Sequence, residues 1–126
     1  MLCGHTLPML AMSTPLATSQ FAYYGLRDVD AVELERVREH RMHVVRSGST
    51  LVEWMSRFDK IHVSYDASCL AHAPAGGAPT FADLHHIFDL VRTSRKLIAV
   101  DVVELNPLQQ VEPPHLLTDA LKSLLL

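Results

Sequence analysis

The sequence predicts an α/β domain with three layers, in which a mostly parallel sheet lies between two layers of helices. Segments with strand-like and helix-like patterns alternate along the chain, which is typical of parallel βαβ units. One segment, "KLIAVDVVEL", is almost continuously apolar, as expected of a strand that is covered on both faces. The 126 residues are 48% hydrophobic and 20% charged, which favours a single globular domain over residues 1–126. The segment 1–20 has no clear pattern.

The first part of the chain predicts two strands and two helices. The aromatic run "FAYYGL" at 21–26 indicates a buried strand. The next segment, "RDVDAVELERVREHR", predicts a helix, because Asp30 and Glu33 have the spacing of a capping box. A short strand is expected at 42–45. A second helix is expected at 47–58, where apolar residues recur at helical spacing after Ser and Thr caps.

The second part of the chain continues the alternation. Residues 61–66 alternate apolar and polar side chains and predict a strand, and the Ala, Gly and Pro content of 67–79 predicts a loop. A capped, periodic segment at 80–94 predicts a helix. The apolar strand then covers 96–105, the segment "NPLQQVEPP" is a loop, and 115–126 closes the chain as a helix.

Composition excludes several classes of function. The formal net charge is −3, so there is no electrostatic reason to expect nucleic acid or an anionic membrane as a partner. Cys3 and Cys69 form no spaced motif, which argues against a disulfide scaffold or a zinc site. The segment 1–20 lacks a basic start and is interrupted by Pro8 and Pro15, so neither a signal peptide nor a membrane helix is expected. A cytoplasmic location is the default expectation.

Acidic residues follow several of the predicted strands. Asp28 comes after the first strand, Asp66 ends the third, and Glu104 follows the core of the last. In parallel α/β sheets, ligands bind outside the carboxyl ends of the strands. The sequence therefore predicts a candidate site at that edge of the sheet. The histidines within the predicted elements, His62 among them, show no ligand spacing, and we interpret them as structural or solvent-exposed.

Three segments carry a resemblance to a known family. The stretches "YYGLRDVDAVE", "IHVSYDAS" and "LIAVDVVELNP" resemble the arginase family of ureohydrolases in their order and spacing. "GLRDVD" favours arginase over agmatinase and formimidoylglutamase, whereas "DVVELNP" is shared by all three. The resemblance implies a three-layer α/β/α fold, two manganese ions and hydrolysis of linear amidine C–N bonds, with L-arginine giving urea and ornithine. It covers the second half of that fold. The first half, with an upstream His and an Asp-Ala-His-x-Asp motif, has no counterpart here.

The resemblance assigns a metal ligand to the third strand. Asp66 matches the first aspartate of the family's Asp-x-Asp pair, and a carboxylate oxygen suits manganese, a hard cation. Ser68 occupies the position of the second aspartate, so that ligand is lost. Without the first-half ligands, the alternative is that Asp66 is a strand-end acid bonded to a loop amide or a helix cap. We favour this alternative for the isolated chain.

Two residues match catalytic positions. Glu104 matches the glutamate that faces the substrate guanidinium, which a carboxylate can bind in bidentate fashion. The alternative is a solvated strand-end residue before a turn. His5, in "GHTLPML", matches the His of the family's His-Gly-Met-Pro turn, which is proposed to contact substrate and transfer a proton. The alternative is a mobile His near a terminus.

Asp30 and Glu33 match residues that recognise the amino-acid end of arginine. The same two residues also form a helix cap with its box partner, and this structural interpretation is at least as well supported.

The resemblance leaves three interpretations of the whole chain. It is an arginase-type hydrolase that is impaired by its missing ligands, or a non-catalytic subunit or interaction module. A half-sheet exposes strand edges, so either a homo-oligomer or pairing with a full-length ureohydrolase would cover them. The third interpretation is a truncated gene product whose first half lies upstream.

Overall fold

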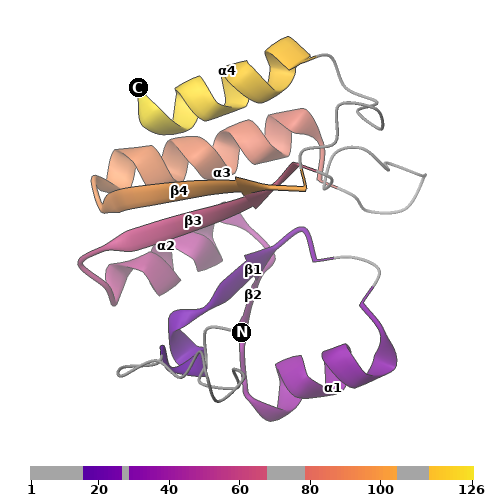
Figure 1. The fold of residues 1–126 in the computed structure, drawn as a ribbon. Coiled ribbons are helices and arrows are strands. Elements are labelled where there is room, and N and C mark those ends of the chain that lie inside the picture. Colours follow the sequence, from indigo (N-terminus) through magenta and orange to yellow (C-terminus); the bar gives the residue numbers. More distant parts are fainter. Residues whose placement is uncertain (1–15, 27–28, 68–78, 105–113) are drawn as a thin grey trace, which may run out of the picture. The chain divides into compact units, whose positions relative to one another are not determined.

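The computed structural model describes residues 16–26, 29–67, 79–104 and 114–126. The chain divides into two compact units, Met1–Arg46 and Ser47–Leu126. Figure 1 shows the helices and strands of each unit.

The described residues of the first unit form one parallel pair of strands and one α-helix. After a 3₁₀ turn at Thr18–Gln20 (η2), the strands β1 (Ala22–Tyr24) and β2 (His43–Val45) pair with Ala22 opposite His43. Helix α1 (Ala31–Glu39) connects them. Gly25 follows β1 with a φ of 68°, a left-handed backbone that glycine adopts without a steric penalty. Because β1 and β2 are parallel and α1 connects them, these elements form a small βαβ unit.

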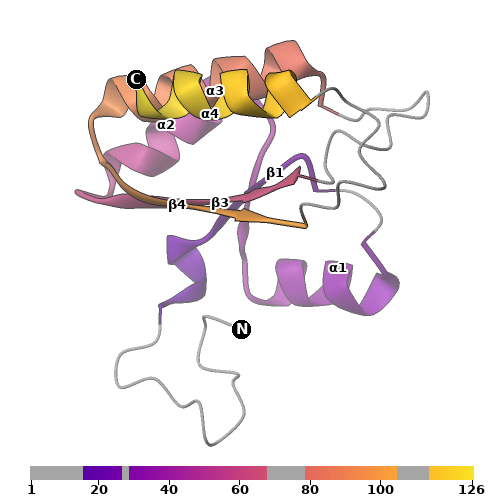
Figure 2. The same cartoon turned by 45° about the horizontal axis from the view of Figure 1, so that its top comes forward.

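In the ranges that the structure describes, the second unit contains another parallel pair of strands and three helices. Its elements, in chain order, are α2 (Gly48–Ser56), β3 (Ile61–Asp66), α3 (Phe81–Ser94), β4 (Leu97–Val103) and α4 (Pro114–Leu125). The pairing of β3 with β4 contains one irregularity between Ile61 and His62. Figure 2 shows α2, α3 and α4 on the same side of the β3–β4 pair.

The core of the second unit lies between this pair and the helices. Leu84, Ile87, Phe88 and Val91 recur at spacings of three and four on α3, and all four are buried. The ring of Phe88 contacts Tyr65 of β3 edge-to-face, with centroids 5.5 Å apart.

A second contact connects α2 to the start of β4. The ammonium of Lys96 donates a hydrogen bond of 2.8 Å to the carbonyl of Met55, near the C-terminal end of α2. A cation at this end of a helix also opposes the negative end of the helix dipole.

The predicted α/β class is confirmed, because helices alternate with strands and both strand pairs are parallel. Two details differ. The strands form two separate pairs among the described residues, where one sheet was expected. The prediction that the last strand is covered on both faces is wrong for the described residues, since Ile98 is 64% exposed and Val103 44%. In this unit the helices cover only one face.

Within the described ranges, no helix has both the length and the apolar character needed to cross a bilayer.

Candidate functional site

The candidate site is the edge where β3 and β4 end. Asp66 is the last residue of β3, and its partner across the pair is Val103, the last residue of β4. Glu104 follows Val103 directly. Neighbouring strands lie about 4.8 Å apart, so the parallel register brings the backbones of Asp66 and Glu104 close together at one edge. Both residues are exposed. The structure thus confirms that two of the strand-end acids share an edge.

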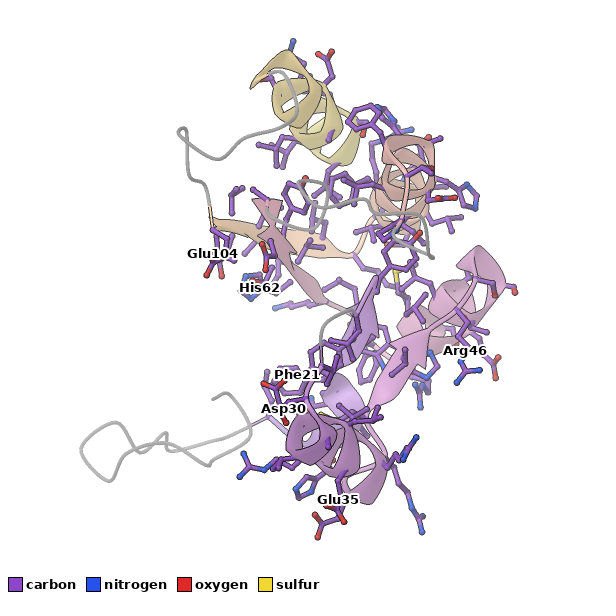
Figure 3. The ribbon with its side chains drawn as sticks, turned by 90° about the vertical axis from the view of Figure 1, so that its right-hand side faces the viewer. Phe21, Asp30, Glu35, Arg46, His62 and Glu104 are labelled. Atoms are coloured by element: carbon purple, nitrogen blue, oxygen red, sulfur yellow. The ribbon has the colours of Figure 1, made fainter. Side chains whose placement is uncertain are left out.

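The same edge continues into an open face of the strand pair. Side chains alternate along β3: Ile61 and Tyr65 are buried toward the helices, whereas His62, Ser64 and Asp66 are exposed. Figure 3 shows His62 and Glu104 on the side away from α3 and α4. A ligand approaching this edge therefore meets polar side chains.

A contact between a histidine and a carboxylate crosses this open face. The Nε2 atom of His62 lies 2.9 Å from a carboxylate oxygen of Asp101, and the two side chains are 45% and 59% exposed. The interpretation of His62 as solvent-exposed is confirmed, but its partner on β4 was missed. The sequence signal that could have indicated this contact is the alternation of side chains along each strand. It places both residues on the outward face of neighbouring strands. An exposed pair of this kind contributes little to stability, about 0–1 kcal/mol.

Glu104 has an unusual backbone conformation. Its φ is 57°, in the left-handed region. For a residue with a Cβ atom this conformation costs roughly 1–2 kcal/mol, and such residues are frequent at binding and catalytic sites. No local sequence signal indicated it, because Glu is not a residue type that favours this region.

Comparison with known proteins identifies the family. The sequence profile described as "Arginase family" matches residues 3–124, nearly the whole chain. The chain belongs to the arginase family.

Several relatives in this family are similar in sequence. The arginase of Emericella nidulans is 35% identical over 106 residues, which cover 70% of this chain and 33% of the relative. That of Agrobacterium fabrum is 31% identical over 140 residues, which cover 94% and 42%. The chain thus spans less than half the length of these relatives.

Solved arginase structures have the same fold. A cold-adapted arginase from the yeast Glaciozyma antarctica superposes with a TM-score of 0.64 at 27% identity, covering 87% of this chain and 42% of that one. The arginase of Entamoeba histolytica superposes with a TM-score of 0.76 at 19% identity, covering 90% and 45%. The latter likeness concerns the fold alone.

The residues expected at the amino-acid end of the substrate form a helix cap. The backbone N–H of Glu33 donates to Oδ1 of Asp30 at 2.8 Å, and the backbone N–H of Asp30 donates to Oε2 of Glu33 at 3.2 Å. Each carboxylate thus satisfies a backbone donor at the start of α1. The structural interpretation of these two residues is supported, and both belong to the first unit. The prediction that they recognise substrate stays untested.

Three predicted residues lie outside the described ranges: His5, Asp28 and Ser68. Their proposed roles stay predictions.

The fit of this chain to the family's metal is partial. Arginase-family proteins typically bind manganese, and the oxygen atoms of Asp66 and Glu104 are suitable donors for it. Among the described residues, however, no group of three or more His, Cys, Asp and Glu side chains gathers in a geometry that would hold a metal ion. The described part of the edge therefore provides carboxylates for a cation but does not form a closed metal site.

Proposed function

We propose that this chain is the guanidinium-facing part of an arginase-type site and that it binds the guanidinium group of L-arginine without hydrolysing it alone. One observation carries the proposal. The β3–β4 register sets Asp66 opposite Val103, so that Glu104 and Asp66 meet at one exposed edge. A carboxylate there can pair with both N–H groups on one side of a planar guanidinium.

The left-handed backbone of Glu104 supports this role. A strained conformation persists only where the surrounding structure holds it, and it fixes the direction in which the side chain leaves the strand. We propose that Glu104 is the main contact to the guanidinium. Asp66 adds a second negative charge and occupies the position of a manganese ligand.

Hydrolysis of arginine to urea and ornithine needs more than this edge. In the family reaction implied by the sequence resemblance, manganese supplies an activated water for attack on the guanidinium carbon. The described residues bring together no group of three or more His, Cys, Asp or Glu side chains that could hold this metal.

The proposal is tested by calorimetric titration of the purified chain with L-arginine, agmatine and guanidinium, each with and without manganese, alongside a urea-release assay. We expect arginine to bind and urea release to be absent. Glu104→Gln should weaken arginine binding about ten- to hundredfold, because it removes a charged partner that contributes roughly 1.5–3 kcal/mol. Asp59→Asn is a matched control, since Asp59 is an exposed acid of the same unit outside this edge.

Two results would contradict the proposal. If the isolated chain releases urea from arginine, the non-hydrolysing assignment is wrong. If Glu104→Gln and Asp59→Asn bind arginine as the parent chain does, Glu104 is not the contact. If agmatine binds more strongly than arginine, the ligand assigned here is wrong and the chain is specific for another ureohydrolase substrate.

A second candidate is a non-catalytic subunit of a full-length ureohydrolase. The separate two-stranded pairs favour it, because neither pair is joined to a larger sheet within the described residues. Co-expression with a full-length arginase-family enzyme, followed by co-purification and an activity assay of that enzyme, tests this candidate. Failure to co-purify would exclude it.

A further inference from the structure

A histidine and a carboxylate lie in contact on the open face of the β3–β4 pair, close to the edge that carries Glu104. The Nε2 atom of His62 is 2.9 Å from a carboxylate oxygen of Asp101, and both side chains remain accessible to solvent. The register sets Asp101 opposite Ser64, one step of side-chain alternation before the last pair of the ladder. The binding of a guanidinium group at the edge uses neither residue of this contact.

The distance from this contact to the edge matches the length of an arginine side chain. Two residues of a parallel strand span about 6.6 Å, and this is the separation along β4 between Asp101 and Val103, which precedes Glu104. In arginine, six bonds separate the guanidinium carbon from the α-nitrogen, and in the extended side chain they span about 7 Å. A guanidinium group bound by Glu104 therefore brings the amino-acid end of the same molecule beside Asp101.

The surface between the contact and the edge suits an aliphatic chain. Ser64 is short and uncharged, and Val103 is an apolar side chain that is 44% exposed. The cross-strand neighbour of His62 is Ala99, whose small side chain leaves room beside the imidazole ring. The methylene groups of a bound ligand would cover part of Val103, and burial of apolar surface is favourable.

We propose that His62 and Asp101 recognise the amino-acid end of the arginine whose guanidinium group Glu104 binds. Asp101 accepts hydrogen bonds from the α-ammonium group. A protonated histidine has two N–H donors, so His62 donates one to Asp101 and the other to the α-carboxylate. Neighbouring groups of opposite charge thus match a zwitterion. The inference rests on the proposed function, and it makes the site selective for α-amino acids that carry a distal cation.

The family resemblance assigns this role to Asp30 and Glu33 instead. Their carboxylates accept the backbone N–H groups that begin α1, and both residues belong to the first unit. His62, Asp101 and Glu104 all belong to the second unit, so the single register of β3 and β4 sets their spacing.

Three ligands distinguish the two ends of the site. L-Arginine carries both charged groups of the amino-acid end, agmatine carries the ammonium alone, and 1-butylguanidine carries neither. Each is titrated calorimetrically into the full chain in mildly acidic buffer, where a histidine holds its proton. We expect Asp101→Asn to weaken arginine and agmatine about tenfold and to leave 1-butylguanidine unchanged. His62→Gln should weaken arginine about tenfold without weakening agmatine, which has no carboxylate.

Two matched controls lie in the same unit, outside the open face. Asp119 of α4 is an exposed acid with a basic partner, Lys122, at 3.5 Å, and His86 of α3 is an exposed histidine. Asp119→Asn and His86→Gln should bind all three ligands as the parent chain does. Circular dichroism confirms that each variant folds.

The three ligands also separate this inference from the function on which it rests. If 1-butylguanidine binds the parent chain and Glu104→Gln abolishes that binding, the guanidinium contact stands. Unchanged arginine affinity in Asp101→Asn and His62→Gln would then overturn the role of these two residues alone. Equal affinity of the parent chain for arginine and 1-butylguanidine would overturn it as well. If 1-butylguanidine does not bind at all, the proposed function fails, and this inference fails with it.

Discussion

The two units of the chain differ most in the burial of apolar side chains. In the first unit, Val45 is the buried hydrophobic residue of the described part, and α1 buries none of its side chains. Val32 of α1 remains 59% exposed. In the second unit α2, α3, α4 and β3 all contribute buried residues to one core. The helix of the first unit therefore has a capping box but no buried side chain, whereas a shared core stabilises the second unit, which carries Asp66 and Glu104.

The most direct test of this difference in burial is to truncate one apolar side chain in each unit. Phe88→Ala should lower the free energy of unfolding by about 3–5 kcal/mol, because Phe88 is 3% exposed and contacts Tyr65. Val32→Ala should change it by less than about 0.5 kcal/mol. Urea unfolding followed by far-ultraviolet circular dichroism, which reports the helices of both units, measures both, and the fluorescence of Trp54, which is buried in the second unit, follows that unit separately. Equal losses would show that the first unit is as well packed as the second.

A smaller effect is expected from the contact between α2 and β4. Lys96→Met removes the hydrogen bond to the carbonyl of Met55 while keeping most of the aliphatic side chain. We expect a loss of about 1–2 kcal/mol in the free energy of unfolding, since a charged donor is involved. Lys60→Met is the control, because Lys60 is exposed and lies next to the same strand pair. A similar loss in both variants would indicate a general charge effect.

The residues with a left-handed backbone give a further comparison of the stability of the two units. At Glu104, glycine should give a folded state about 1 kcal/mol more stable than alanine does, because glycine carries no Cβ penalty there. Arg95 of the same unit has a φ of 58°, so its glycine variant should likewise be more stable than its alanine variant. Arg41 has a φ of 50° in the first unit, and its glycine variant should leave the unfolding transition of the second unit unchanged. Thermal unfolding of the glycine and alanine pairs separates these cases.

The smallest expected effect concerns acid stability. The side chain and backbone of Thr80 donate hydrogen bonds to Asp83 and lower the pKa of its carboxyl group from the usual 3.8. Since the folded-state pKa is the lower one, the stabilisation is fully present above 3.8 and is lost as the pH falls through the folded-state value.

Asp83→Asn should therefore reduce stability near neutral pH, and the difference from the parent chain should disappear in strong acid. Urea midpoints measured across this pH range report it. Asp30→Asn alters the corresponding cap of α1 and should shift the far-ultraviolet dichroism without moving the Trp54 transition. A pH-independent difference for Asp83→Asn would rule out the hydrogen bonds from Thr80 as its cause.

Much of the second unit could be predicted from sequence, because its elements carry strong periodic signals. The strand at 61–66 was predicted with the bounds that the structure shows, and the helix at 80–94 begins one residue later. Both signals depend on side chains that alternate or recur within one element. The meeting of Asp66 and Glu104 at one edge also followed from sequence, since it requires only that neighbouring strands run parallel.

What could not be predicted depends on neighbours distant in sequence. The apolar composition of β4 indicated cover on both faces, but composition does not show whether a covering layer is present. The pairing of His62 with Asp101 depends on the register between two strands, which the irregularity beside His62 shifts. The left-handed conformation of Glu104 is likewise not revealed by its residue type.

The left-handed conformation of Glu104 has a consequence for how such sequences drift. Selection for stability alone would replace this residue by glycine or asparagine, which adopt the conformation more readily. A lineage that no longer needs the carboxylate should therefore lose it early, well before the buried residues of α3 change. Sampling this one codon among close relatives would date the loss, or the persistence, of ligand binding.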